Sequence, residues 1–192
     1  RLTGELHDIG ITAPIEFYDH HLTHAASAYF TSSFKDCVIL TADGGGDDEI
    51  YLRANEAGAP QEFLVNTDYQ VDHQYYPSIA ALKNGGFVVS WRDEDGSNRG
   101  GGSSDDVFGQ RYDASGMELG DEFRVNQYTS SNQRYPSMAV LKNGGFVVAW
   151  RSVDQDGSQG GIFGQRYAAD GSLVGTELQI NTSTSGQQTS PS

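Results

Sequence analysis

The chain of 192 residues carries 26 acidic and 12 basic side chains, which gives a formal net charge of -14 at pH 7. Such a charge repels phosphate backbones and anionic lipid surfaces, so we expect neither nucleic acid nor membrane as a partner. No apolar run approaches the roughly 20 residues that span a bilayer. The single cysteine, Cys37, excludes an intrachain disulfide. The sequence begins at Arg1 without a methionine and without a signal-like segment, and Pro191 matches an internal position of a repeat. We therefore expect both ends to lie inside a longer protein.

The first motif in the chain is a group of histidines ahead of a helix-compatible segment, residues 22–30. A helix here would place His20 and His24 one turn apart on the same face, with His21 pointing elsewhere. Imidazole nitrogens at this spacing form half of a zinc or iron site. The alternative is a surface helix that carries two histidines without binding a metal.

A glycine-rich turn follows the next predicted strand. Residues 36–42 predict a buried strand, and residues 49–52 predict a second strand after the turn. Consecutive glycines let backbone N–H groups approach a phosphate closely, and flanking carboxylates suit a metal-bridged phosphate. The candidate phosphate-binding residues are Asp43, Gly44, Gly45 and Gly46. A loose hairpin turn is the alternative.

Together, the run from His20 to Ala28 and the turn that begins at Asp43 resemble the N-terminal domain of the carbamoyltransferases that modify antibiotics and nodulation factors. The resemblance implies an actin-like nucleotide-binding fold. It also implies carbamoyl transfer from carbamoyl phosphate, through a carbamoyl-adenylate, to a hydroxyl group of a small-molecule substrate. It would make His20 and His24 ligands of iron or zinc, and would bring ATP to residues 43–46.

The resemblance covers only about residues 9–47, and it identifies no catalytic residue. The other metal ligand and the adenosine and acceptor pockets have no counterpart here. An active site needs convergent groups held by the rest of its fold, so we expect the chain to be inactive by itself.

From about residue 51 the chain is a tandem repeat. Residues 76–92 recur as 135–151 at an offset of 59, residues 108–112 recur as 163–167 at an offset of 55, and Pro191 opens a third copy. The sequence therefore divides into a carbamoyltransferase-like α/β fragment and a β-repeat region. Their predicted bounds are 1–50 and 51–192, with units at about 61–120 and 121–176 and the start of a third to 192.

Each unit predicts four strands, so the fold class is mainly β after a short α/β fragment. In the first unit the strands are 78–82, 87–91, 107–112 and 122–125, with turns at 83–86 and 113–116. The Asn84–Gly85 pair supplies the positive φ values of a tight hairpin. Four strands resemble a propeller blade, but a solenoid or a string of sandwich-like units fits the pattern too. Too few units to close a propeller would leave edges that favour self-association.

An acidic loop follows the tryptophan of each unit, Trp91 or Trp150. Alternating carboxylates before a glycine offer oxygen ligands for calcium, although the motif is short. The candidate calcium ligands are Asp93, Asp95, Asp154 and Asp156. A plain turn is the alternative. We expect both tryptophans to anchor the core, with sugar stacking as the alternative.

Two functions stay open at this point. The repeats resemble the acidic, Gly-rich repeats of large secreted or surface-displayed bacterial proteins, which implies a scaffold or adhesion role with protein or glycan partners. The enzyme-like segment suggests a cytoplasmic location, whereas the repeats suggest secretion or the cell surface. A third alternative is that two proteins were joined in error between Gly46 and Tyr51.

Overall fold

The computed structural model describes residues 38–39, 51–56, 59–68, 73–94, 104–157, 159–183 and 186–191, with the backbone alone at 38–39, 51–56 and 59–63. Every regular element among these residues is a β-strand, so the predicted mainly β class is confirmed. The described part contains no helix of the length and apolarity needed to cross a membrane. The helix predicted at 22–30 lies outside the described residues.

A small antiparallel sheet precedes the repeats and consists of β1 (Val38–Ile39), β2 (Tyr51–Glu56) and β3 (Ala59–Leu64), in that order. In this sheet Val38 lies opposite Ala54 and Ile39 opposite Arg53. The two strands predicted on either side of the glycine-rich turn are therefore antiparallel neighbours. The described part of the second strand begins at Tyr51, and residue 49 lies outside the described residues.

Each repeat forms a four-stranded antiparallel sheet whose strands follow chain order. Unit 1 (residues 74–126) contains β4 (Gln74–Ala81), β5 (Phe87–Asp93), β6 (Asp106–Tyr112) and β7 (Phe123–Arg124). Unit 2 (residues 133–181) contains β8 (Gln133–Val140), β9 (Phe146–Ser152), β10 (Gly161–Tyr167) and β11 (Leu173–Gln179). All four predicted strands of a unit are present. The first begins at Gln74 rather than residue 78, because a register shift between Tyr75 and Ser78 extends it.

The first turn of each unit has the predicted position but a different geometry. In unit 1, Gly85 has a φ of 88°, while Asn84 is not among the residues with positive φ. The side-chain oxygen of Asn84 instead accepts a hydrogen bond from the Gly86 amide at 3.1 Å. The loop therefore needs one left-handed residue, and the asparagine contributes through its side chain. Unit 2 repeats this arrangement with Gly144 at 89°.

The second turn is stabilised by an aspartate that caps its own loop. The hydroxyl of Ser115 donates to the carboxylate of Asp113 at 2.6 Å, and Ser172 donates to Asp170 at 2.7 Å. These hydrogen bonds hold the pKa of both aspartates below its usual value. The capped turns therefore favour the ionised form of both carboxylates. They stabilise the folded state at pH values above the pKa of an aspartate in the unfolded chain, and this stabilisation is lost as the pH falls through the lower pKa of the folded state.

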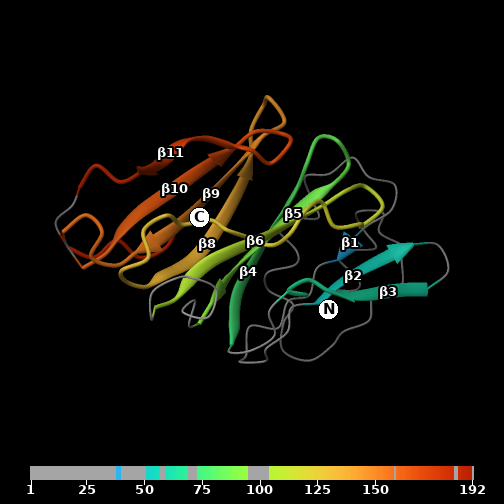
Figure 1. Cartoon of the computed structure of the whole chain (residues 1–192), viewed down its shortest axis with the longest axis horizontal. Helices are drawn as coiled ribbons and strands as arrows, with labels where there is room; N and C mark the ends of the chain where they lie inside the picture. The colour runs from blue at the N-terminus through green and yellow to red at the C-terminus, as the bar shows by residue number, and fades with distance from the viewer. Residues whose placement is uncertain are drawn as a thin grey trace, which may run out of the picture.

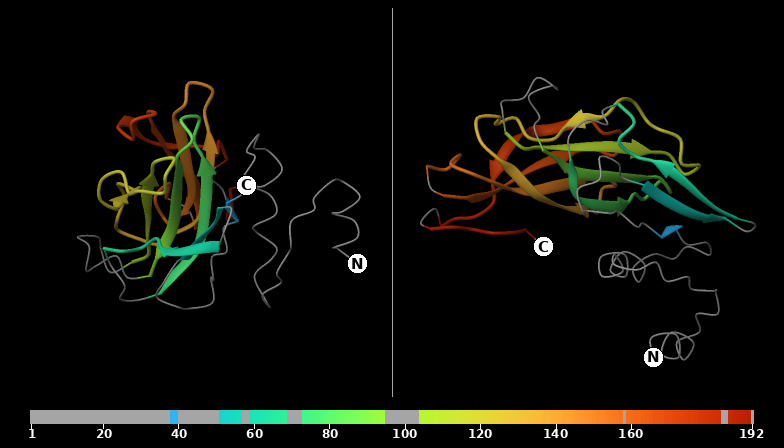
Figure 2. Two further views of the ribbon diagram at one scale, coloured as in Figure 1. Left: turned by 90° about the vertical axis from the view of Figure 1, so that its right-hand side faces the viewer. Right: turned by 90° about the horizontal axis from the view of Figure 1, so that it is seen from below.

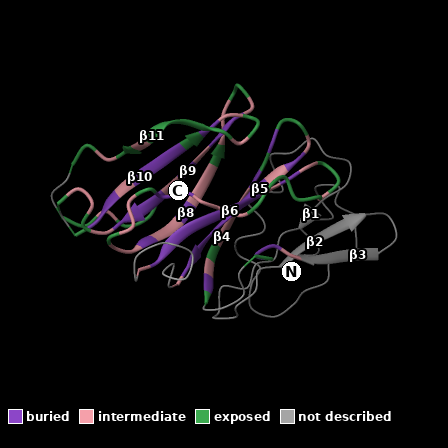
Figure 3. Cartoon of the chain, viewed as in Figure 1, coloured by how far each residue is buried: buried purple, intermediate pink, exposed green. Residues whose placement is uncertain are grey.

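The hydrophobic core lies between the sheets. Unit 1 lies between unit 2 and the β1–β3 sheet (Figures 1 and 2), and β4, β5 and β6 all contact β8. The shared core contains residues of both units, and the central strands are largely buried (Figure 3). Its buried members are Ala80, Leu82, Val88, Val107, Val125, Phe146, Val148, Trp150, Phe163 and Tyr167.

A second cluster joins unit 1 to the segment that precedes it. Val65 packs there with Val89, Trp91, Phe108 and Tyr112, and the hydroxyl of Tyr112 donates to the Val65 carbonyl at 3.2 Å. Trp91 and Trp150 are both fully buried, which confirms the predicted core role. Sugar stacking on these rings is wrong, because a ring buried on both faces presents no surface to a ligand.

Candidate functional site

The residues assigned to metal and phosphate binding lie outside the described part of the chain. They are His20, His24, Asp43, Gly44, Gly45 and Gly46. The pairing of β1 with β2 brings together the strands that flank the glycine-rich turn. The roles of these six residues stay predictions.

The four candidate calcium ligands are distributed over different local structures. Asp93 is buried at the end of β5, and Asp95 lies outside the described residues. Asp154 is exposed with a φ of 61°, and the Asp156 carboxylate accepts a hydrogen bond from Gln179 at 3.3 Å. Among the described residues, no three His, Cys, Asp or Glu side chains are grouped so as to hold a metal ion. Calcium binding by these loops stays a prediction.

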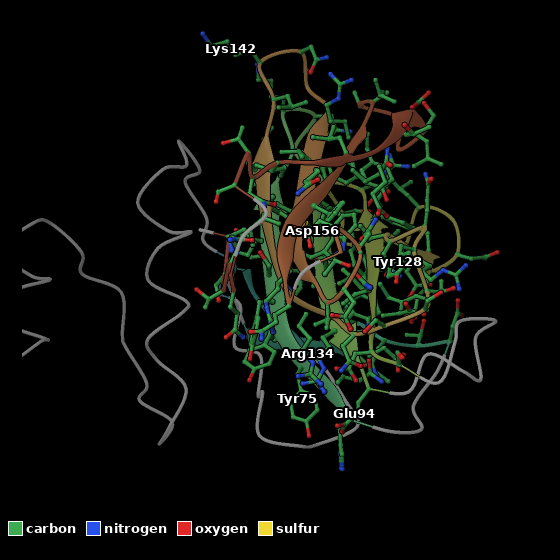
Figure 4. All side chains as sticks on the ribbon, turned by 90° about the vertical axis from the view of Figure 1, so that its left-hand side faces the viewer. Tyr75, Glu94, Tyr128, Arg134, Lys142 and Asp156 are labelled. Atoms are coloured by element: carbon green, nitrogen blue, oxygen red, sulfur yellow. The ribbon has the colours of Figure 1, made fainter. Side chains whose placement is uncertain are left out.

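An ion-pair cluster at one end of the sheets joins the two units. The carboxylate of Asp105 lies 2.9 Å from Nε of Arg92 in unit 1 and 2.5 Å from Nε of Arg134 in unit 2. The carboxylate is buried; Arg134 donates a charge-assisted hydrogen bond to it, and Arg92 forms an ion pair with it. The cluster therefore links β5 and the start of β6 to β8 across the interface. Glu94 adds a contact of 3.3 Å to Arg92. Figure 4 shows Glu94 and Arg134 at the same end of the molecule.

Sequence reasoning missed this cluster, although the repeat alignment contained a signal for it. Asp105 and Asp106 replace the glycines found at the equivalent positions 160 and 161 of unit 2. Arg151, the counterpart of Arg92, therefore has no such carboxylate, and it donates to the carbonyl oxygens of Gln159 and Gln188 instead. The acidic pair marks the place where unit 1 departs from the repeat to form a charged interface.

An aromatic group borders the ion-pair cluster. The Arg92 guanidinium lies over the ring of Tyr75 at 4.8 Å, and His73 packs edge-on against the same ring at 5.9 Å. The rings of Tyr76 and Tyr135 meet edge-to-face at 4.8 Å across the units. Figure 4 shows Tyr75 and Arg134 toward the same end of the molecule.

The two paired tyrosines have an unusual backbone. Tyr76 has a φ of 53° and Tyr135 a φ of 57°, values that a non-glycine residue adopts at a cost of about 1–3 kcal/mol. Each lies inside the register shift of its strand and precedes a proline. The bulge directs both rings toward the unit interface, so the strain serves packing between units. Because the carboxylates of Asp105 and Glu94 together balance the charges of Arg92 and Arg134, the arrangement suits structural cohesion better than capture of an anion.

A second buried carboxylate lies beside this cluster. Asp106 is fully buried and faces Asp93 across the β5–β6 pair. Its carboxylate accepts a hydrogen bond from the side-chain amide of Asn126 at 2.6 Å, and Arg124 lies 3.9 Å away. Burial raises the pKa of Asp106, with the hydrogen bond and Arg124 opposing that shift.

The raised pKa predicts a pH effect. A carboxyl whose pKa is higher in the folded state stabilises the fold when protonated, and that stability is lost as the pH rises from the unfolded pKa through the folded one. We expect Asp106→Asn to raise the free energy of unfolding at pH 7, with the gain shrinking as the pH falls toward the ordinary pKa of an aspartate. Urea denaturation across this pH range measures it, with the exposed Asp121→Asn as control. A variant less stable at pH 7 would show that the ionised carboxylate is the stabilising form.

With the geometry described, the class of protein is clear: the described part of the chain is a tandem β-repeat protein with tightly joined units. The chain belongs to the carbamoyltransferase N-terminus family, whose model matches residues 4–146. The family resemblance is thereby confirmed. The match extends beyond residue 47 through unit 1, and it crosses the suggested junction between Gly46 and Tyr51. The predicted domain bounds stay predictions.

Two further similarities are limited. The nodulation protein NolNO of Sinorhizobium fredii (strain NBRC 101917 / NGR234) is 58% identical over 33 residues, which cover 17% of this chain and 5% of that protein. The chain thus matches a small part of this curated relative's length. An endo-arabinase from Bacteroides thetaiotaomicron VPI-5482 superposes with a TM-score of 0.40 and 16% identity, over 79% of this chain and 63% of that one.

Proposed function

We propose that this chain is part of an enzyme that transfers a carbamoyl group from carbamoyl phosphate, with ATP, to a hydroxyl group of a small molecule. The observation that carries the proposal is the family match over residues 4–146. The 58% identity to a nodulation protein over 33 residues supports it. A small-molecule acceptor is consistent with the acidic chain, which disfavours nucleic acid as a substrate.

The proposal assigns the chemistry to the N-terminal segment. His20 and His24 would hold iron or zinc, and residues 43–46 would contact the ATP phosphates. A bound metal would supply positive charge beside the phosphates. The described residues offer no grouped metal ligands, so this proposal places no part of the reaction in the repeats.

The repeats support a second candidate function, that of a scaffold that joins other parts of a larger protein or binds a protein or glycan. The observation that favours this function is the extensive interface between the two units. Unit 2 covers unit 1 with a shared apolar core, and the Asp105 cluster closes one end of that core. Such stacking gives repeat proteins rigid, extended surfaces. Calcium held by the acidic loops would belong to this function.

Metal content tests the enzyme proposal. After loading the purified chain with Fe²⁺ or Zn²⁺, we expect about one equivalent of metal by mass spectrometry, reduced at least about tenfold in affinity in His20→Ala and His24→Ala. His21→Ala is the matched control, because a helix would direct this side chain away from the pair. We expect no turnover of ATP and carbamoyl phosphate by the chain alone.

Two results would count against the enzyme proposal. One is an absence of bound metal, and the other is an equal loss of metal from the His21→Ala variant. The same preparation, titrated with calcium, separates the two functions: calcium-dependent thermal stabilisation that disappears in Asp156→Ala would support the scaffold.

A further inference from the structure

The two units differ in how their equivalent apolar faces are covered. In unit 1, Val125 is only 1% exposed, and Phe123 packs on the same core. The residues that cover this face come from unit 2. They are Phe146, Val148, Trp150, Phe163 and Tyr167. Each unit therefore offers one apolar face to the unit that follows it.

No described residue covers the matching face of unit 2. At an offset of 55, Leu178 and Ile180 correspond to Phe123 and Val125, and they are 39% and 46% exposed. We call this surface the outer face of unit 2; it comprises Ala139, Leu141, Val147, Ile162, Leu178 and Ile180. The counterparts of the first four in unit 1 are buried, whereas here Ala139 is exposed and the other three are half-buried. Figure 3 shows the exposed strand β11 at this side.

The backbone beside this face already forms the hydrogen bonds that, in unit 1, lie where the next unit begins. In unit 1, the amide of Gln133 donates to the Asp105 carbonyl at 2.8 Å where unit 2 begins. In unit 2 the amide of Gln188 donates to the Gly160 carbonyl at 3.1 Å. Gln188 and Gly160 lie 55 positions after Gln133 and Asp105, so the hydrogen bond is the equivalent one. Asn181 also reproduces Asn126: its side-chain oxygen accepts from the amide of Ile162 at 2.7 Å.

Polar contacts at the rim repeat in the same way. The Glu122 carboxylate of unit 1 accepts from the backbone amide of Asp68, in the preceding segment, at 3.0 Å. The Glu177 carboxylate of unit 2 accepts from the amide of Gln127, which follows unit 1, at 2.7 Å. Each unit thus brings an apolar face and a glutamate to the unit before it. A third unit would meet the outer face of unit 2 and the loop after Asn181 on the same terms.

We propose that the outer face of unit 2 is a docking surface for a third repeat unit of the same kind, which enters through residues 187–191. Its occupant presents a phenylalanine, a valine, a tryptophan, a second phenylalanine and a tyrosine at the positions equivalent to the covering residues of unit 2. This inference concerns assembly of the repeats and is independent of the proposed enzymatic activity.

Thiol labelling of an extended chain tests the proposal. A copy of residues 138–192 is joined after Ser192, which keeps the offset of 55, and Cys37→Ser removes the native thiol. In this background we expect the Ile180→Cys variant to react at least about tenfold more slowly in the extended chain than in the 192-residue chain. Leu173→Cys is the control: Leu173 is 59% exposed and corresponds to the exposed Glu118, so its rate should not change.

Three outcomes would overturn the proposal. The first is equal labelling of the Ile180→Cys variant in both chains. The second is an added copy that contributes no strand signal in circular dichroism, because the face would then have failed to accept a unit with the matching apolar set. The third is protection in the 192-residue chain that rises with protein concentration, because a second copy of the chain would then be the occupant.

Discussion

Replacing Trp150 by alanine is expected to lower the free energy of unfolding by about 3–5 kcal/mol. The side chain is fully buried in the core shared by both units, so truncation leaves a cavity that the two sheets cannot fill. Its indole nitrogen also donates to the side-chain oxygen of Gln133 at 2.9 Å. The variant leaves that buried acceptor without its donor, which adds to the loss. Equilibrium urea denaturation followed by circular dichroism measures the effect.

Two controls separate the contributions to this loss. Trp150→Phe keeps much of the ring but removes the indole donor, so its cost should be smaller than that of the alanine variant. Leu173→Ala, at an exposed position on β11, should change stability by no more than about 0.5 kcal/mol. A Trp150→Ala loss below about 1 kcal/mol would mean that the interface between the units is not a cooperative core.

Replacing Gly145 by alanine is expected to cost about 2–4 kcal/mol, although it adds only one carbon atom. A Cβ at this position would overlap the carbonyl oxygen of Tyr167 and lie 3.4 Å from the Cα of Ala168. Both are backbone atoms at the end of β10, where the ladder to β9 holds Tyr167 opposite Phe146. The strands must therefore separate locally to admit the methyl group. Thermal and urea unfolding measure the change.

The control isolates steric overlap from backbone conformation. Gly186 has a φ of +83°, but a Cβ added there would meet no atom within 4 Å, so Gly186→Ala should cost only about 1 kcal/mol. Gly86 is the counterpart of Gly145 in unit 1. A Cβ on Gly86 would overlap the Tyr112 carbonyl oxygen in the same way, so Gly86→Ala should show the same loss. A cost for Gly145→Ala no greater than that for Gly186→Ala would contradict the steric explanation.

The strands and turns of the repeats could be predicted because their signals are local. The run of β-branched and aromatic residues after Gly86 specifies β5, and the Asn-Gly turn before it connects β5 to β4. The starting point of β4 could not be predicted, because a bulge at Tyr76 is stabilised by contacts with Tyr135 of the other unit. Such a contact depends on packing between units and has no local signal.

Much less of the candidate site could be predicted. The family was recognised from the histidines and the glycine-rich turn, and the family match confirms it. The Asp105 cluster was missed because its arginines lie on two different units and meet only when the sheets stack. The acidic loops suggested calcium, yet Asp93 belongs to a buried strand rather than to its loop. Spacing along the chain does not determine which carboxylates lie close together in the folded protein.

The sequence by itself determined the family, the mainly β class and the repeat, since these follow from motifs and from alternating patterns within one segment. Only the tertiary structure decided which copies of a residue are buried. Val125 and Ile180 occupy equivalent positions in their units, but one is covered by the next unit and the other is exposed. The physical reason is that burial depends on which neighbour removes water from an apolar side chain.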